Sequence, residues 1–137
     1  MIGKTLGPYE ITSQLGQGGM GAVYRARDTQ LGREVAIKLI PEELGDSADS
    51  LARFEREAKL LASLNHPGIA TVYGQDQVEG SRFLAMELVD GGTLTERLDR
   101  GPLPRDEAVQ IALEIATALE AAHAQRIFHR DIKPSNI

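Results

Sequence analysis

The spacing of hydrophobic residues changes near Pro41, and this change constrains the fold more than any other feature of the sequence. Before Pro41, short stretches of alternating apolar and polar residues are separated by glycines. They predict a meander of antiparallel strands at about residues 9–15, 22–29 and 33–40. After Pro41, apolar residues recur at intervals of three and four over residues 50–64, which is typical of an amphipathic helix. The sequence therefore predicts an α+β fold.

Two further strands are expected after this helix, at about residues 69–75 and 82–88. Residues 90–93 read Asp-Gly-Gly-Thr, and paired glycines of this kind interrupt regular structure, so this segment is interpreted as a linker. A short helix is predicted over residues 93–99. Five strands and one longer helix are thus predicted before the linker.

The longest predicted helix covers residues 104–125, within a second domain that starts at residue 90. Its polar residues Gln110, Glu114 and Thr117 form a narrow stripe, and most of the remaining circumference is apolar. A helix that is apolar on most sides is normally buried among neighbours. Few residues follow this helix, so we expect that the helical domain around it is incomplete.

Composition excludes several classes of function. The chain has no cysteine, which rules out disulfides and thiolate metal sites and suits a reducing compartment. Fifteen basic against twenty acidic residues give a net charge of −5, which argues against a nucleic-acid partner. No apolar run is long enough for a signal peptide or a membrane segment, so the sequence predicts a cytoplasmic location.

A glycine-rich motif lies between the first two predicted strands. Residues 16–23 read GQGGMGAV and contain G-x-G-x-x-G-x-V. Alone, the motif is weak, because a glycine-rich hairpin turn has the same composition. A dinucleotide-binding loop would lead into a helix, whereas residues 22–27 predict a strand. Without Cβ atoms, backbone N–H groups at the motif glycines can close over an anion, and Val23 could cover a flat base.

Lys38 ends the sequence Val-Ala-Ile-Lys on the third predicted strand, which places Ala36 and Lys38 on one face. A strand lysine usually extends its ammonium to solvent, but apolar neighbours make a purely solvated role less suitable here. Glu57 lies within the apolar stripe of the helix at residues 50–64, which makes it the expected partner of Lys38. The alternative is an exposed pair between Glu57 and Arg53.

The most specific motif lies at residues 129–136, which read HRDIKPSN. A solvated turn before a strand would not need this order of polar residues. Together with the glycine motif and Val-Ala-Ile-Lys, the segment resembles the Hanks-type protein kinases, from about residue 9 to residue 137. Lys133, two positions after Asp131, resembles the serine/threonine branch, and residues 15–24 (LGQGGMGAVY) resemble its bacterial members.

The resemblance implies a two-lobed kinase fold, with a complete N-terminal lobe at residues 1–89 and the start of the C-terminal lobe at residues 90–137. It implies transfer of the γ-phosphate of ATP to serine or threonine of protein substrates, with Mg²⁺ as cofactor. The residues that match the family's nucleotide-binding positions are Gly16, Gln17, Gly18, Gly19, Gly21, Val23, Ala36, Lys38, Glu57, Met86, Glu87 and Val89.

Roles in the nucleotide site follow from the same resemblance. Lys38 is expected to hold the α- and β-phosphates and to pair with Glu57, while the glycine motif covers the triphosphate. Met86 is expected at the back of the adenine pocket. Glu87 and Val89 are expected to offer backbone groups to the adenine edge.

The resemblance also assigns the catalytic residues Asp131, Lys133 and Asn136. Asp131 is expected to accept or orient the proton of the substrate hydroxyl, and Lys133 to steady the γ-phosphate. Asn136 is expected to hold a magnesium ion. His129 and Arg130 are expected to order the loop.

Two departures from the family pattern limit these expectations. Gly68 follows His66-Pro67 where the family often has asparagine, which puts the local turn in doubt. No Asp-Phe-Gly and no activation segment follow the catalytic loop, so this chain by itself is expected to be a poor kinase. A nucleotide-binding pseudokinase, a kinase-docking module and a non-functional truncated product remain alternatives, although the intact site residues argue against loss of function by drift.

Overall fold

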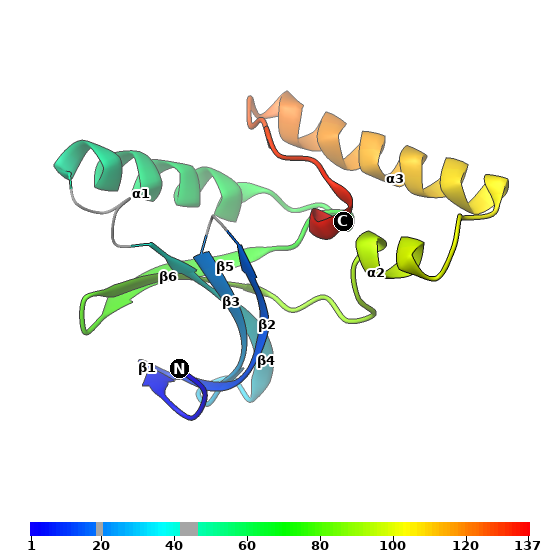
Figure 1. Cartoon of the computed structure of the whole chain (residues 1–137). Coiled ribbons are helices and arrows are strands. Elements are labelled where there is room, and N and C mark those ends of the chain that lie inside the picture. Colours follow the sequence, from blue (N-terminus) through cyan, green and yellow to red (C-terminus); the bar gives the residue numbers. More distant parts are fainter. Residues whose placement is uncertain (19–20, 42–46) are drawn as a thin grey trace. The chain divides into compact units, whose positions relative to one another are not determined.

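A computed structural model describes residues 1–18, 21–41 and 47–137 of the chain (Figure 1). The chain divides into two compact units, Met1–Ser63 with Ala70–Leu88, and Leu64–Ile69 with Val89–Ile137. In chain order the elements are β1 (Thr5–Leu6), β2 (Tyr9–Gly18), β3 (Gly21–Asp28), β4 (Arg33–Ile40), α1 (Ala48–Ser63), β5 (Val72–Val78), β6 (Ser81–Glu87), α2 (Leu94–Asp99), α3 (Arg105–Ala124) and the 3₁₀ turn η2 (Pro134–Asn136).

The first unit contains an antiparallel sheet of six strands among the described residues, in the order β1-β2-β3-β4-β6-β5. The α+β class and all five predicted strands are confirmed. The sixth strand, β1, was not predicted, because a two-residue strand is too short to show an alternating pattern. β5 begins at Val72, three residues later than expected, because a turn in which Ile69 N–H donates to the carbonyl of His66 precedes it.

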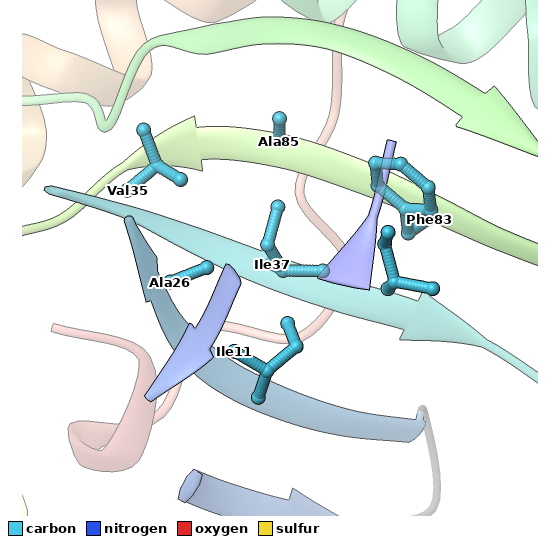
Figure 2. Close-up of a cluster of buried hydrophobic side chains, with 7 residues drawn as sticks. Ile11, Ala26, Val35, Ile37, Phe83 and Ala85 are labelled. Carbon is cyan, nitrogen blue, oxygen red and sulfur yellow. The ribbon is translucent and has the colours of Figure 1, made fainter. Parts of the chain in front are cut away.

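One face of this sheet buries the main hydrophobic core. Figure 2 shows side chains from β2, β3, β4 and β6 gathered in this core, namely Ile11, Ala26, Val35, Ile37, Phe83 and Ala85. Phe83 and Ile37 are fully buried, and burial of such side chains contributes about 1.5 to 3 kcal/mol each. Tyr9 packs its ring edge-to-face on Phe83 at a centroid distance of 5.8 Å. Burial, with a further contribution from the Asp28 carboxylate, raises the pKa of Tyr9.

Helix α1 packs against residues of the opposite face. Its buried stripe consists of Phe54, Ala58 and Leu61, which recur at intervals of four and three. These side chains contact Val72 and Leu84 of β5 and β6. The amphipathic helix predicted over residues 50–64 is therefore confirmed, with its start two residues earlier.

The second unit contains helices α2 and α3. Thr93 caps α2 by accepting the N–H of Glu96, and the Glu96 carboxylate accepts the N–H of Thr93. A Cβ atom at Gly92 would collide with that carboxylate, and Gly92 also has a positive φ of 85°. The paired glycines of the predicted linker therefore allow the capped helix to start where it does. No helix among the described residues has the length and apolarity needed to span a lipid bilayer.

Helix α3 has the expected length but not a fully covered apolar surface. Ala118 and Ala122 are buried, whereas Val109 and Leu113 are about 60% exposed. Gln110 donates to Glu114 at 3.1 Å along the predicted polar stripe. The predicted helix is confirmed over Arg105–Ala124, and its N-terminal half exposes part of its apolar surface.

Candidate active site

Several side chains of the sheet share the face to which α1 contributes its apolar stripe. The register places Val23 opposite Lys38 and Lys38 opposite Leu84, while Ala36 lies opposite Met86. Cross-strand partners project to the same side of a sheet, so these residues form one surface, named here the Lys38 face. The prediction that Ala36 and Lys38 share a face is confirmed, since the residues between them in sequence lie in the core of Figure 2.

The glycine motif forms the end of the β2–β3 hairpin beside the Lys38 face. Gly16 pairs with Val23, and Gly18 pairs with Gly21, so both strands continue into the motif. Gly21 has a φ of 108°, and a Cβ atom there would collide with the carbonyl oxygen of Leu39. Glycine is thus required at position 21 for two reasons, backbone conformation and close approach to β4.

The motif also contains Gln17 and Gly19. Gln17 is exposed and pairs with Ala22 in the ladder. Gly19 lies outside the described residues. The interpretation of the motif as a loop joining two antiparallel strands, rather than a strand and a helix, is confirmed.

No ion pair joins Lys38 to Glu57 in the part of the chain that the structure describes. Glu57 is exposed on α1, and it does not pair with Arg53 among the described contacts either. The reason lies in the packing of the helix. Ala58 is at the centre of the buried stripe, and the neighbouring position is rotated by about 100°, which turns Glu57 toward solvent. The described residues therefore lack a direct Lys38–Glu57 ion pair, and their pairing stays a prediction.

Glu87, the last residue of β6, forms two hydrogen bonds with Thr71, which immediately precedes β5. The N–H of Glu87 donates to the carbonyl of Thr71 at 2.7 Å. The N–H of Thr71 donates to the side-chain Oε2 of Glu87 at 3.0 Å. Sequence reasoning assigned only backbone groups to Glu87 and overlooked this use of its carboxylate, because Thr71 is distant in sequence. Val89, also expected near a base, is exposed and belongs to the second unit.

In the second unit, three polar side chains predicted to be catalytic lie together. The Lys133 Nζ is 3.2 Å from Asp131 Oδ2. The side-chain amide of Asn136 donates to the main-chain carbonyl of Asp131 at 2.9 Å and approaches Asp131 Oδ2 at 3.5 Å. The structure thus brings together Asp131, Lys133 and Asn136, which the family resemblance assigned to one catalytic site.

Local backbone geometry sets this arrangement. The N–H of Asp131 donates to Nδ1 of His129 at 3.1 Å, across Arg130, which has a positive φ of 65°. The turn η2 then returns Asn136 to Asp131. A non-glycine residue with positive φ is uncommon and costs about 1 kcal/mol or more, so the surrounding hydrogen bonds must hold it.

The Asp131–Lys133 pair is open to solvent, with about half of each side chain exposed. An exposed pair of this kind contributes at most about 1 kcal/mol to stability. Lys133 can therefore exchange Asp131 for another anion at small cost. An arriving phosphate group would be such an anion.

Asn136 is also suited to a divalent cation. Its amide nitrogen is directed to Asp131, which leaves the amide oxygen for another partner. Carboxylate and amide oxygens are ligands that Mg²⁺ accepts, usually together with phosphate oxygens and water. The described residues contain no group of three or more histidine or acidic side chains that could hold a metal by themselves.

Comparison with known proteins identifies the family of this chain. The family model described as the protein kinase domain matches residues 9–137. The chain belongs to the protein kinase family.

Two bacterial kinases illustrate the similarity. The chain is 43% identical over 137 residues to the serine/threonine-protein kinase PknD of Mycobacterium tuberculosis, covering 99% of this chain and 21% of that protein. It is 45% identical over 136 residues to the probable serine/threonine-protein kinase SCO3848 of Streptomyces coelicolor, covering 96% of this chain and 20% of that protein. The chain thus spans about a fifth of the length of these kinases.

A solved kinase structure has the same fold. The PknI kinase domain of Mycobacterium tuberculosis matches with a TM-score of 0.84 and 32% identity, over 99% of this chain and 56% of that one. The kinase fold predicted from the sequence motifs, with a sheet and one helix in the N-terminal lobe and helices of the C-terminal lobe, is confirmed.

Proposed function

We propose that this chain binds ATP on the Lys38 face and carries the catalytic loop of a protein kinase that phosphorylates serine or threonine. The observation that carries the proposal is the Lys38 face itself, where Lys38 lies among the apolar side chains of Val23, Ala36, Leu84 and Met86 beside the glycine hairpin. The Arg25–Glu34 ion pair lies on the same side of the sheet. In this proposal residues 1–89 are the N-terminal lobe and residues 90–137 begin the C-terminal lobe. A cytoplasmic location belongs to the same proposal, because the proposed phosphate donor is ATP.

Each part of the Lys38 face suits a part of the nucleotide. Val23, Ala36 and Met86 offer apolar surface to the flat base, and the small side chain of Ala36 leaves room for it. The ammonium of Lys38 lies on the same surface and can bind the α- and β-phosphates. Backbone N–H groups of the glycine motif, at Gly16 to Gly21, can cover the triphosphate. Glu87 and Val89 offer backbone groups to the base edge.

The catalytic loop supplies the groups for transfer. The hydroxyl oxygen of a substrate serine or threonine attacks the γ-phosphorus, the bond from that phosphorus to the β–γ bridging oxygen breaks, and the hydroxyl proton passes to the Asp131 carboxylate. Lys133 leaves Asp131 for the transferred phosphate, which its exposed ion pair permits. Asn136 offers its amide oxygen to Mg²⁺, which when bound neutralises charge on the phosphates.

The choice of serine and threonine rests on two observations. Lys133 follows Asp131 by two positions, and the related proteins are named serine/threonine-protein kinases. The net charge of −5 does not favour a nucleic-acid substrate. A protein substrate therefore fits the chain best.

Nucleotide binding by purified protein tests the proposal. Lys38→Met should weaken ATP binding by about tenfold to a hundredfold, the range expected when a charged hydrogen bond is lost. Lys59→Met is the matched control, because Lys59 is exposed on α1 and should leave the affinity unchanged. Equal ATP affinity of wild type and Lys38→Met, by titration calorimetry, would remove Lys38 from the site.

A further inference from the structure

An ion pair between Arg25 and Glu34 borders the Lys38 face. The register places Arg25 of β3 directly opposite Ala36 of β4, and directly opposite residues have Cβ atoms about 5 Å apart. Arg25 Nη1 donates to both carboxylate oxygens of Glu34, at 3.0 Å and 3.3 Å. The side chain of Arg25 is 33% exposed, so most of it is covered by neighbouring atoms. Arg25 thus lies beside Ala36, one of the residues proposed to receive the base.

The ion pair lies at the end of the Lys38 face that is distant from Lys38 itself. Along β4, Glu34, Ala36 and Lys38 alternate with residues of the hydrophobic core and project to the same side. At about 3.3 Å per residue, Glu34 and Lys38 are about 13 Å apart along the strand. The bond to Glu34 holds the Arg25 guanidinium toward that distant end. A base over Ala36 would therefore lie between the ammonium of Lys38 and the guanidinium of Arg25.

Pairing with Glu34 decides which part of a nucleotide Arg25 suits. The carboxylate of Glu34 offsets the positive charge of the guanidinium, so the pair as a whole has no net charge with which to attract phosphate. A guanidinium also has flat faces, which pack on aromatic rings, and adenine is a flat aromatic ring system. The methylene carbons of arginine add apolar surface. Arg25 is therefore suited to the base rather than to the phosphates.

We infer that Arg25, held by Glu34, is a further nucleotide-binding residue, which contacts the base and contributes to the affinity for the adenosine part of ATP. Its side chain extends the apolar surface of Val23 and Ala36 toward Glu34. Glu34 acts through Arg25 and is a positioning residue. The inference rests on the proposed binding of ATP to the Lys38 face.

Titration of purified protein with ATP and with adenosine tests the inference. Arg25→Ala should lower the affinity for both ligands by the same factor, about threefold to tenfold, because only a base contact is lost. Arg25→Lys keeps a cation for Glu34 but no flat guanidinium, and should also lower both affinities. Lys38→Met should lower the affinity for ATP alone. Arg27→Ala should change neither affinity and is the matched control, because Arg27 is exposed on the same side of β3 and lies opposite Glu34 rather than Ala36.

The inference and the proposed function fail in different ways. If wild type does not bind ATP, the proposed function is wrong and the inference fails with it. If wild type binds ATP but not adenosine at millimolar concentration, or if Arg25→Ala binds adenosine as tightly as wild type, only the inference is overturned. An equal loss of affinity in Arg27→Ala would assign the effect to a general change of charge and overturn it as well. If Arg25→Ala and Arg25→Lys both fail to fold, as judged by circular dichroism, Arg25 serves the sheet rather than the base, which also overturns the inference.

Discussion

Gly68 and Ala118 approach so closely that a Cβ atom added to Gly68 would lie 3.1 Å from the Cβ of Ala118. The N–H of Gly68 also donates to Nδ1 of His66 at 2.9 Å, and the same added Cβ would lie 3.1 Å from that nitrogen. The turn after His66-Pro67 is thus closed by the histidine ring and packed against α3. This close approach leaves little room for a side chain at position 68, which glycine satisfies.

Gly68→Ala should therefore destabilise the protein by about 1 to 3 kcal/mol, the usual cost of overpacking. Gly74→Ala is the matched control, because a Cβ atom at Gly74 meets no neighbour within 4 Å. Denaturant unfolding compares the two variants. Adding Ala118→Gly to Gly68→Ala should restore part of the loss, and no recovery in the double variant would contradict the packing explanation.

Gly21→Ala should weaken nucleotide binding more than Gly16→Ala does. Gly21 has a φ of 108° and approaches the Leu39 carbonyl, whereas a Cβ atom at Gly16 meets nothing within 4 Å. The strained conformation alone costs about 1 to 2 kcal/mol, enough to shift the hairpin away from β4. ATP titration of both variants is the measurement. Equal affinities would show that the hairpin is not held by its contact with β4.

Asp131→Asn should lower the rate of phosphate transfer by about 10² to 10⁴ while ATP affinity stays nearly unchanged, because the carboxylate serves the substrate hydroxyl. The chain spans 56% of the solved kinase domain, so the assay uses it joined to the remaining segment of a related kinase domain. Single-turnover rates with ATP and a serine peptide are measured, with the exposed Asp99→Asn as control. Equal rates for wild type and Asp131→Asn would exclude Asp131 from the reaction.

Stability should fall at alkaline pH in a way that depends on Tyr9. Burial raises the pKa of Tyr9 above its usual value of 10.0, so the folded state holds the proton more tightly than the unfolded state. The resulting stability is fully present below pH 10 and is lost as pH rises through the folded-state pKa. Tyr9→Phe should remove this part of the pH dependence of the unfolding free energy. An unchanged alkaline profile in Tyr9→Phe would assign the loss to other groups.

Purified protein should self-associate through the exposed apolar residues of α3. Val109 and Leu113 lie one turn apart, and exposed neighbouring apolar residues promote association. Replacing both by glutamine should lower the apparent mass in sedimentation at high concentration, with little change in stability, because neither side chain is buried. Glu120→Gln, an exposed change on the same helix, is the control. Identical association of the double variant and wild type would place the contact elsewhere.

Local patterns in the sequence predicted most of the fold. The change of hydrophobic period near Pro41 separated strands from helices, because side-chain direction repeats every two residues in a strand and every 3.6 in a helix. The strand register of Ala36 and Lys38 followed from the same rule. The cluster of Asp131, Lys133 and Asn136 could be predicted because its members lie within one short loop, so that few backbone conformations are open to them.

The remaining relationships depended on tertiary packing. Whether Glu57 faces Lys38 is decided by which residue of α1 packs most deeply on the sheet, and Ala58 takes that place. The contact of the Glu87 carboxylate with Thr71 joins the end of β6 to the residue before β5, and nothing in the intervening sequence marks it. A local pattern fixes the direction of a side chain relative to its own helix or strand. Only packing between elements decides how each helix is rotated on the sheet, and thus which polar groups meet.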